Sequence, residues 1–213
     1  MKGRTWWSRL LSVVLLLLVS AGIWVGGLRI LYHLYPLTYA EVVDRYAREY
    51  SIDPFLIMAM IRVESSFKPQ SISPRGAVGL MQVMPATAQD MAARIGIEEF
   101  DPEHDLLEPE TNIRIGVCYL ADLVREFGPR TAVVLAAYNA GRGTVRRWLE
   151  QEIWDGDPGG LARVPYDETR RYVARVLTTV RWYYRIYRGR WPRGEIKSEL
   201  RAQWHPGLPT LAR

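Results

Sequence analysis

The feature that most constrains the fold is a run of 19 residues without a charged side chain, from position 10 to position 28. At 1.5 Å per residue, a helix of this length is about enough to cross a hydrocarbon layer of ~30 Å. Three basic residues and no acidic residue precede the run, and basic flanks of this kind stay on the cytoplasmic side of a membrane. The sequence therefore predicts a membrane anchor over residues 1–29. It would cross the cytoplasmic membrane once and leave the rest of the chain on the extracytoplasmic side.

The same run also fits a secretory signal peptide, with the small residues Val19-Ser20-Ala21 as its cleavage site. Apolar residues continue past that point through Ile23, Trp24 and Val25, which favours an anchor that is not cleaved. Both interpretations export the remaining chain. We expect residues 30–37 to form a linker.

Most of the positive charge belongs to the anchor. The formal net charge is +5, and residues 1–29 contain four basic and no acidic side chains. Of the 28 Lys and Arg, 24 therefore remain after residue 29 against 23 Asp and Glu. Arginines recur between residues 170 and 190, but helical spacing spreads them around the helix, so we expect no nucleic-acid binding. The single cysteine, Cys118, excludes an intrachain disulfide and is expected in the core.

Apolar residues after the linker recur at helical spacing. Thr38 and Glu41 have the spacing of a capping box, and Asp53 with Pro54 suits the start of a second helix. That second helix is apolar on nearly every side, which predicts a buried central helix. Further helices are expected over 86–95, 110–127, 130–140 and 167–187. No segment alternates apolar and polar residues clearly enough to predict a strand. The expected fold is a mostly α single domain over 38–190, followed by an irregular tail over 191–213.

Glu64 stands out on the second helix because it follows Ile57, Met60 and Ile61 by seven, four and three positions. It therefore continues the apolar face of that helix. A carboxylate on such a face loses hydration, which raises its pKa toward the range of a general acid. The alternative is structural: Glu64 pairs with an arginine or points into water at the helix end.

Glu64 also opens a series of ordered motifs. They read E-S-S-F at 64–67, S-P-R-G-A-V-G-L-M-Q-V-M-P at 73–85, A-Y-N-A-G at 137–141 and E-T-R-R-Y-V at 168–173. In order and spacing these segments resemble the signature segments of lytic transglycosylases with a soluble-type, goose-lysozyme-like catalytic domain. A further element between Asp105 and Leu120 is also similar. The resemblance extends over about residues 40 to 187.

The resemblance implies a lysozyme-like fold that binds peptidoglycan glycan strands. It implies non-hydrolytic cleavage of the MurNAc-β-1,4-GlcNAc bond to a 1,6-anhydro product, with Glu64 as the single acid/base. The implied substrate-binding residues are Ser73, Gln82, Met84, Tyr138, Asn139, Glu168 and Tyr172. No metal ion or cofactor is expected.

Other interpretations remain open at this stage. A hydrolytic lysozyme of the same fold would need a second group to activate water, and would leave a reducing end instead of an anhydro end. A catalytically silent glycan-binding protein would carry the same motifs. Considered alone, Gln82 is also consistent with an exposed side chain on the surface. Tyr138 and Asn139 are likewise consistent with residues that cap the C-terminal end of a helix.

Overall fold

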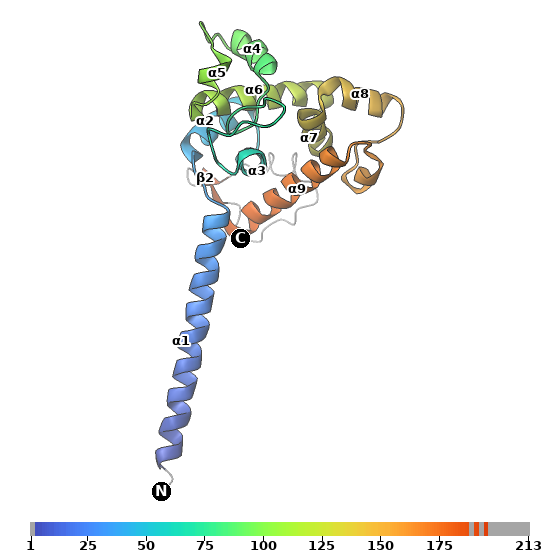
Figure 1. Ribbon diagram of the computed structural model, residues 1–213. Coiled ribbons are helices and arrows are strands. Elements are labelled where there is room, and N and C mark those ends of the chain that lie inside the picture. The colour runs from blue at the N-terminus through green and yellow to red at the C-terminus, as the bar shows by residue number, and fades with distance from the viewer. Residues whose placement is uncertain (1–2, 188–189, 192–193, 196–213) are drawn as a thin grey trace. The chain divides into compact units, whose positions relative to one another are not determined.

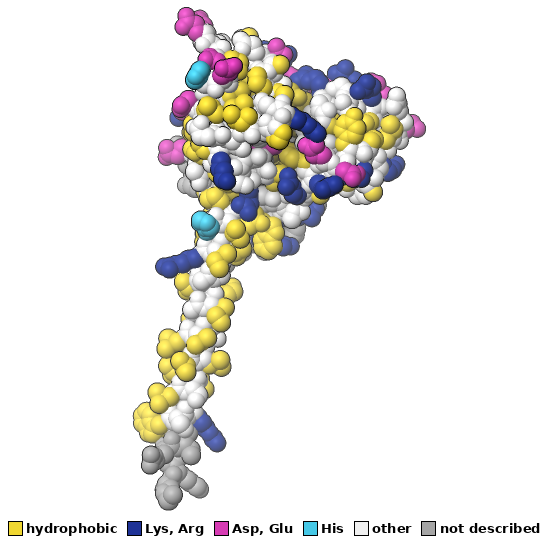
Figure 2. Space-filling view, viewed as in Figure 1, with side chains coloured by type: hydrophobic (Ala, Val, Ile, Leu, Met, Phe, Trp, Pro, Cys, Tyr) yellow, Lys and Arg dark blue, Asp and Glu magenta, His cyan; other side chains and the backbone are white. Residues whose placement is uncertain are grey.

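The structure, a computed structural model, describes residues 3–187, 190–191 and 194–195, and the chain divides into two units, 1–36 and 37–213. The first unit contains helix α1 (Gly3–Leu34), whose apolar side chains are exposed along its length (Figure 2). The part from Trp6 to Leu34 is long and apolar enough to cross a membrane. A signal sequence near the N-terminus has the same properties, so retention of the anchor stays a prediction.

The prediction of a linker over 30–37 is wrong for residues 30–34, since α1 continues to Leu34. Residues 30–34 contain no glycine or proline, and Pro36 is the first residue after the apolar run that opposes a helix.

The second unit is mostly α-helical, as the sequence predicts (Figure 1). Its helices are α2 (Ala40–Tyr50), α3 (Pro54–Ser65), α4 (Pro85–Arg94), α5 (Pro102–Asp105), α6 (Pro109–Phe127), α7 (Thr131–Ala140), α8 (Arg142–Glu150), the 3₁₀ helix η1 (Pro158–Arg163) and α9 (Asp167–Tyr187). The four later helices expected from the sequence lie within one residue of α4, α6, α7 and α9. The sequence analysis missed α5, α8 and η1, which are short.

Two details of the expected fold are wrong. The proposed capping box fails because α2 begins at Ala40, and its N-cap is Tyr39, in a left-handed conformation without a side-chain capping hydrogen bond. The tail beyond residue 190 begins with an antiparallel pair, β1 (Arg190–Trp191) and β2 (Gly194–Glu195). Trp191 is buried, and its ring lies 5.5 Å from that of Phe55. Residues 192–193 and 196–213 lie outside the described part of the chain.

Helix α3 forms the centre of the core, as expected, and packs mainly against α9. Asp53 caps its start by accepting a hydrogen bond from the Phe55 amide at 2.8 Å, and the Tyr184 hydroxyl donates to the same carboxylate at 2.6 Å. The ring of Phe55 lies 4.9 Å from that of Tyr184. The start of α3 is thus fixed to the end of α9, and Glu64, at the other end of α3, faces the first half of α9. Cys118 is buried, as predicted.

Candidate active site

Glu64 lies in the last turn of α3 and is half-buried. Burial raises the pKa of its carboxyl from 4.5 to about 7. Tyr172 and Arg175, both on α9, favour the ionised form and oppose the rise, whereas the negative charge of Glu168 adds to it. The sequence pattern thus predicted both the environment and the direction of the pKa shift. It did not predict the counteracting charge of Arg175.

Two tyrosines flank this carboxyl group. The Tyr172 side chain is buried, and its hydroxyl lies beside the Glu64 carboxylate and favours the ionised form of that group. Burial, followed by the nearby charge of Glu64, raises the pKa of the hydroxyls of Tyr138 and Tyr172 well above the usual range, so both stay protonated. The Tyr138 hydroxyl donates a hydrogen bond to the Met81 carbonyl at 2.9 Å. Glu64, Tyr138 and Tyr172 therefore form one cluster from three helices.

A loop from Pro69 to Met84 follows α3 and carries three further candidates. Ser73 accepts a hydrogen bond from the Ala77 amide at 3.0 Å through its hydroxyl. The side-chain amide of Gln82 donates to the carbonyls of Ser71 and Gly79, both at 2.9 Å. These two polar side chains therefore stabilise the loop itself. Met84, in contrast, is 44% exposed at the start of α4.

Hydrogen bonds from the neighbouring helices hold this loop in place. The fully buried Asn112 of α6 accepts from the Met81 amide at 2.8 Å and donates to the carbonyls of Val78 at 2.9 Å and Leu106 at 2.8 Å. Ser65 of α3 donates to the Leu80 carbonyl at 2.8 Å. The roles of Asn112 and Ser65 could not be predicted from the sequence, because a single amide or hydroxyl on a helix does not indicate its hydrogen-bond partner.

Gly79 allows the loop to approach this closely. Its φ is +80°, and a Cβ built there would lie 2.1 Å from the Asn112 side-chain nitrogen and 2.3 Å from the Leu106 carbonyl oxygen. Both the backbone conformation and the contact therefore require glycine. Gly76 in the same loop also has a positive φ.

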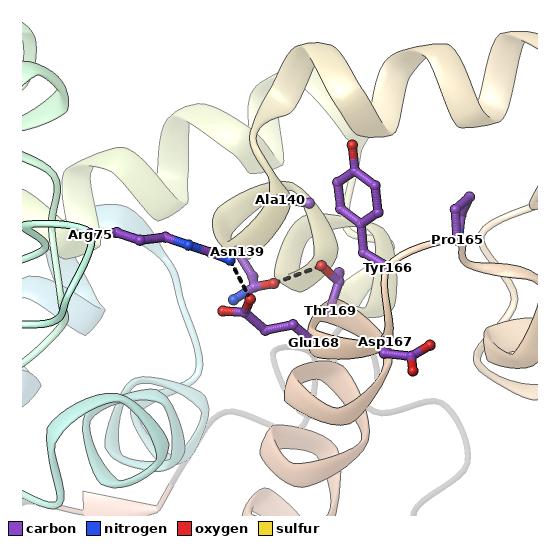
Figure 3. A pocket seen from close by; sticks show the side chains of 8 residues that line it. All are labelled: Arg75, Asn139, Ala140, Pro165, Tyr166, Asp167, Glu168 and Thr169. Atoms are coloured by element: carbon purple, nitrogen blue, oxygen red, sulfur yellow. Dashed lines mark hydrogen bonds and ion pairs between the residues drawn. The ribbon is translucent and has the colours of Figure 1, made fainter.

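The described residues also enclose a hollow of about 550 Å³ between the loop, the end of α7 and the start of α9 (Figure 3). Its lining residues are Arg75, Asn139, Ala140, Pro165, Tyr166, Asp167, Glu168 and Thr169. Arg75 and Glu168 form an ion pair across it at 2.8 Å, and Thr169 donates to the side-chain oxygen of Asn139 at 2.7 Å.

The hollow brings together two of the expected residues, Asn139 and Glu168. Ser73, Gln82 and Met84 lie along the loop and are not part of its lining. Two lining residues were not predicted from the sequence: Arg75, which lies inside the 73–85 motif, and Tyr166, which is 52% exposed. Within the part of the chain that the structure describes, no group of three or more His, Cys, Asp or Glu residues is placed to hold a metal ion.

Comparison with known proteins gives a consistent result. The family model described as transglycosylase SLT domain matches residues 41–157. The soluble lytic murein transglycosylase of Salmonella typhimurium is 41% identical over 156 residues, which is 73% of this chain and 24% of that protein. The membrane-bound lytic murein transglycosylase C of Edwardsiella ictaluri is 34% identical over 168 residues, covering 70% of this chain and 47% of that protein. The chain thus spans about a quarter of the soluble relative and about half of the membrane-bound one.

Solved structures agree with the sequence relatives. The 70 kDa soluble lytic transglycosylase of Escherichia coli superposes with a TM-score of 0.70 at 36% identity, over 82% of this chain and 28% of that one. An inactive glutamate-to-glutamine mutant of the lytic transglycosylase Slt from Pseudomonas aeruginosa superposes with a TM-score of 0.65 at 31% identity. It covers 78% of this chain and 26% of the mutant protein. The lysozyme-like fold expected from the motifs is therefore confirmed.

Proposed function

The chain belongs to the transglycosylase SLT domain family, and from this premise we propose that it is a peptidoglycan lytic transglycosylase with Glu64 as its single acid/base. The observation that carries the proposal is the half-buried Glu64, with a pKa of about 7, at the first of the ordered motifs. A carboxyl group with this pKa exchanges a proton readily near neutral pH, as a group that acts first as acid and then as base must do. The inactive glutamate-to-glutamine mutant of the Pseudomonas aeruginosa relative supports the same reading.

In the proposed reaction, protonated Glu64 donates its proton to the glycosidic oxygen between MurNAc and GlcNAc. The bond to C1 of MurNAc breaks, and the substrate's own N-acetyl group stabilises the positive charge at C1. The ionised Glu64 then takes the proton from the C6 hydroxyl of the same MurNAc, whose oxygen attacks C1 and closes the 1,6-anhydro ring. The attack is intramolecular, so it needs a held sugar conformation and consumes no water.

The remaining candidates serve this reaction as substrate contacts. We assign Ser73, Gln82, Met84, Tyr138, Asn139, Glu168 and Tyr172 to the saccharide groove. Tyr172 has the strongest structural support, because its buried hydroxyl lies beside the Glu64 carboxylate and favours the ionised form of that group. The scheme requires no metal ion or cofactor. Because Glu64 must be protonated at the start, activity should fall as the pH rises beyond about 7.

We also propose that α1 anchors the enzyme in the cytoplasmic membrane as a single span with the second unit outside. The apolar surface of α1 and the basic residues before it support this topology. Sequencing the N-terminus of the mature protein tests retention of the anchor, and a start at Gly22 would contradict it.

The products of the wild-type enzyme test the reaction. Purified sacculi are digested in water enriched in oxygen-18, and the released fragments are analysed by mass spectrometry. We expect 1,6-anhydro ends without the heavy isotope. Reducing ends that carry oxygen-18 would instead identify a hydrolytic lysozyme, and no release would indicate a silent glycan-binding protein.

A further inference from the structure

The hollow beside the cluster of Glu64 contains a charged pair, and the proposed reaction gives no role to one of its members, Arg75. Arg75 extends from the loop and Glu168 from the first turn of α9, and their side chains meet over the hollow (Figure 3). Their side chains are 73% and 58% exposed. Of the eight described residues that line the hollow, Arg75 is the only one with a positive charge.

An ion pair this exposed is readily exchanged. Measured contributions of exposed ion pairs lie at about 0.2–1 kcal/mol, because water screens the charges and two long side chains lose freedom. A guanidinium also has five N–H donors in a planar fork that matches a carboxylate. A second carboxylate that enters the hollow can therefore replace Glu168 as the ion-pair partner of Arg75 with only a small loss of free energy.

The proposed substrate offers carboxylates in only one of its two parts. The sugars of the glycan strand present hydroxyl and amide groups, which are uncharged. The peptide stem attached to the lactyl group of MurNAc ends in free carboxylates. A cationic side chain within the cleft therefore distinguishes stems with free carboxylates from stems whose carboxylates are amidated.

We propose that Arg75 is a specificity-determining residue that binds a carboxylate of the peptide stem, and that Glu168 occupies its guanidinium in the free enzyme. This inference rests on the proposed function, because it names the part of the peptidoglycan substrate, the peptide stem, that binds at the hollow. The exposed ring of Tyr166, which packs edge-on against Trp148 at 5.1 Å, forms an apolar wall of the hollow that suits the aliphatic part of a peptide stem.

The test compares two substrates and two variants. One substrate is intact glycan strands with peptide stems, and the other is the same strands after the stem carboxylates have been converted to amides. For Arg75→Gln we expect the ratio of kcat/KM on intact strands to that on amidated strands to fall about tenfold, the effect of losing one charge-assisted contact. The control is Arg171→Gln on α9, because Arg171 is similarly exposed, at 77%, and does not line the hollow. Its ratio should stay at the wild-type value.

Each result has a distinct meaning. An unchanged ratio for Arg75→Gln, including an equal loss on both substrates, would overturn the assignment of Arg75. A wild-type enzyme that releases no product from either substrate would overturn the proposed function instead. As a second measurement on the unmutated protein, amidation of the stem carboxylates should lower kcat/KM by a similar factor, and no change would contradict the proposal.

Discussion

The end of α3 and the loop from Pro69 to Met84 meet at the same site, but different forces hold them in place. Helix α3 is fixed by apolar burial, since every residue from Phe55 to Ile61 is fully buried. The loop is fixed by hydrogen bonds to its backbone, given by Asn112, Ser65 and Gln82. Glu64 and the loop that faces it are therefore held in place by different kinds of interaction. Burial of α3 excludes water from Glu64 and so raises its pKa, whereas the conformation of the loop depends on a few side-chain hydrogen bonds.

The largest effect on stability is expected from Asn112→Ala. This change leaves the Met81 amide and the Leu106 carbonyl without a partner in a buried site, while the Val78 carbonyl keeps the Val83 amide as its donor. A buried polar group without a hydrogen bond costs about 1–3 kcal/mol, so we expect a loss of roughly 3–5 kcal/mol in the free energy of unfolding. Urea unfolding measures it, with Gln70→Ala, an exposed amide on the same loop, as the control. A loss as small as that of the control would show that the loop does not depend on Asn112.

The dependence of stability on pH separates the contribution of α3 from that of the loop. The raised pKa means that folded Glu64 keeps its proton between pH 4.5 and about 7 while the unfolded chain has released it. Stability from this group is therefore fully present below pH 4.5 and is lost as the pH rises to about 7. Glu64→Gln removes this loss. The quantity to compare is the free energy of unfolding of the variant minus that of the wild type. We expect this difference to be about 2–3 kcal/mol larger at pH 8 than at pH 4.5.

Paired unfolding curves at the two pH values provide the measurement, with Glu98→Gln, an exposed carboxylate, as the control. A difference between wild type and Glu64→Gln that does not change with pH would contradict the burial of Glu64. The loop plays no part in this prediction, so the result bears on the helix alone.

The smallest effect is expected from Ser65→Ala, which removes one of the hydrogen bonds between α3 and the loop. The Leu80 carbonyl loses its donor, and we expect a loss of about 1 kcal/mol. Thermal unfolding with a fixed scan rate measures it. An unchanged midpoint would show that α3 and the loop are stabilised independently at this contact.

The same contrast explains how much could be predicted from the sequence. Apolar periodicity predicted α3, its burial and the direction of the Glu64 pKa shift, because all three follow from spacing along one helix. The hydrogen bonds of the loop join residues as far apart as Val78 and Asn112, and nothing local in the sequence specifies such a pairing. The Arg75–Glu168 pair is missed for the same reason. The motif resemblance nevertheless identified the segments, though not the contacts that position them.

Release of anhydro-muropeptides by the purified Glu64→Gln protein tests the central claim most directly. The amide can neither donate nor accept the proton that the reaction moves, and general acid–base catalysis contributes about 10²–10⁴-fold to rate. We therefore expect turnover to fall by at least about 10²-fold, in a sample whose unfolding transition shows a native fold. Near-normal release from such a sample would contradict the assignment of Glu64 and the one-carboxylate mechanism with it.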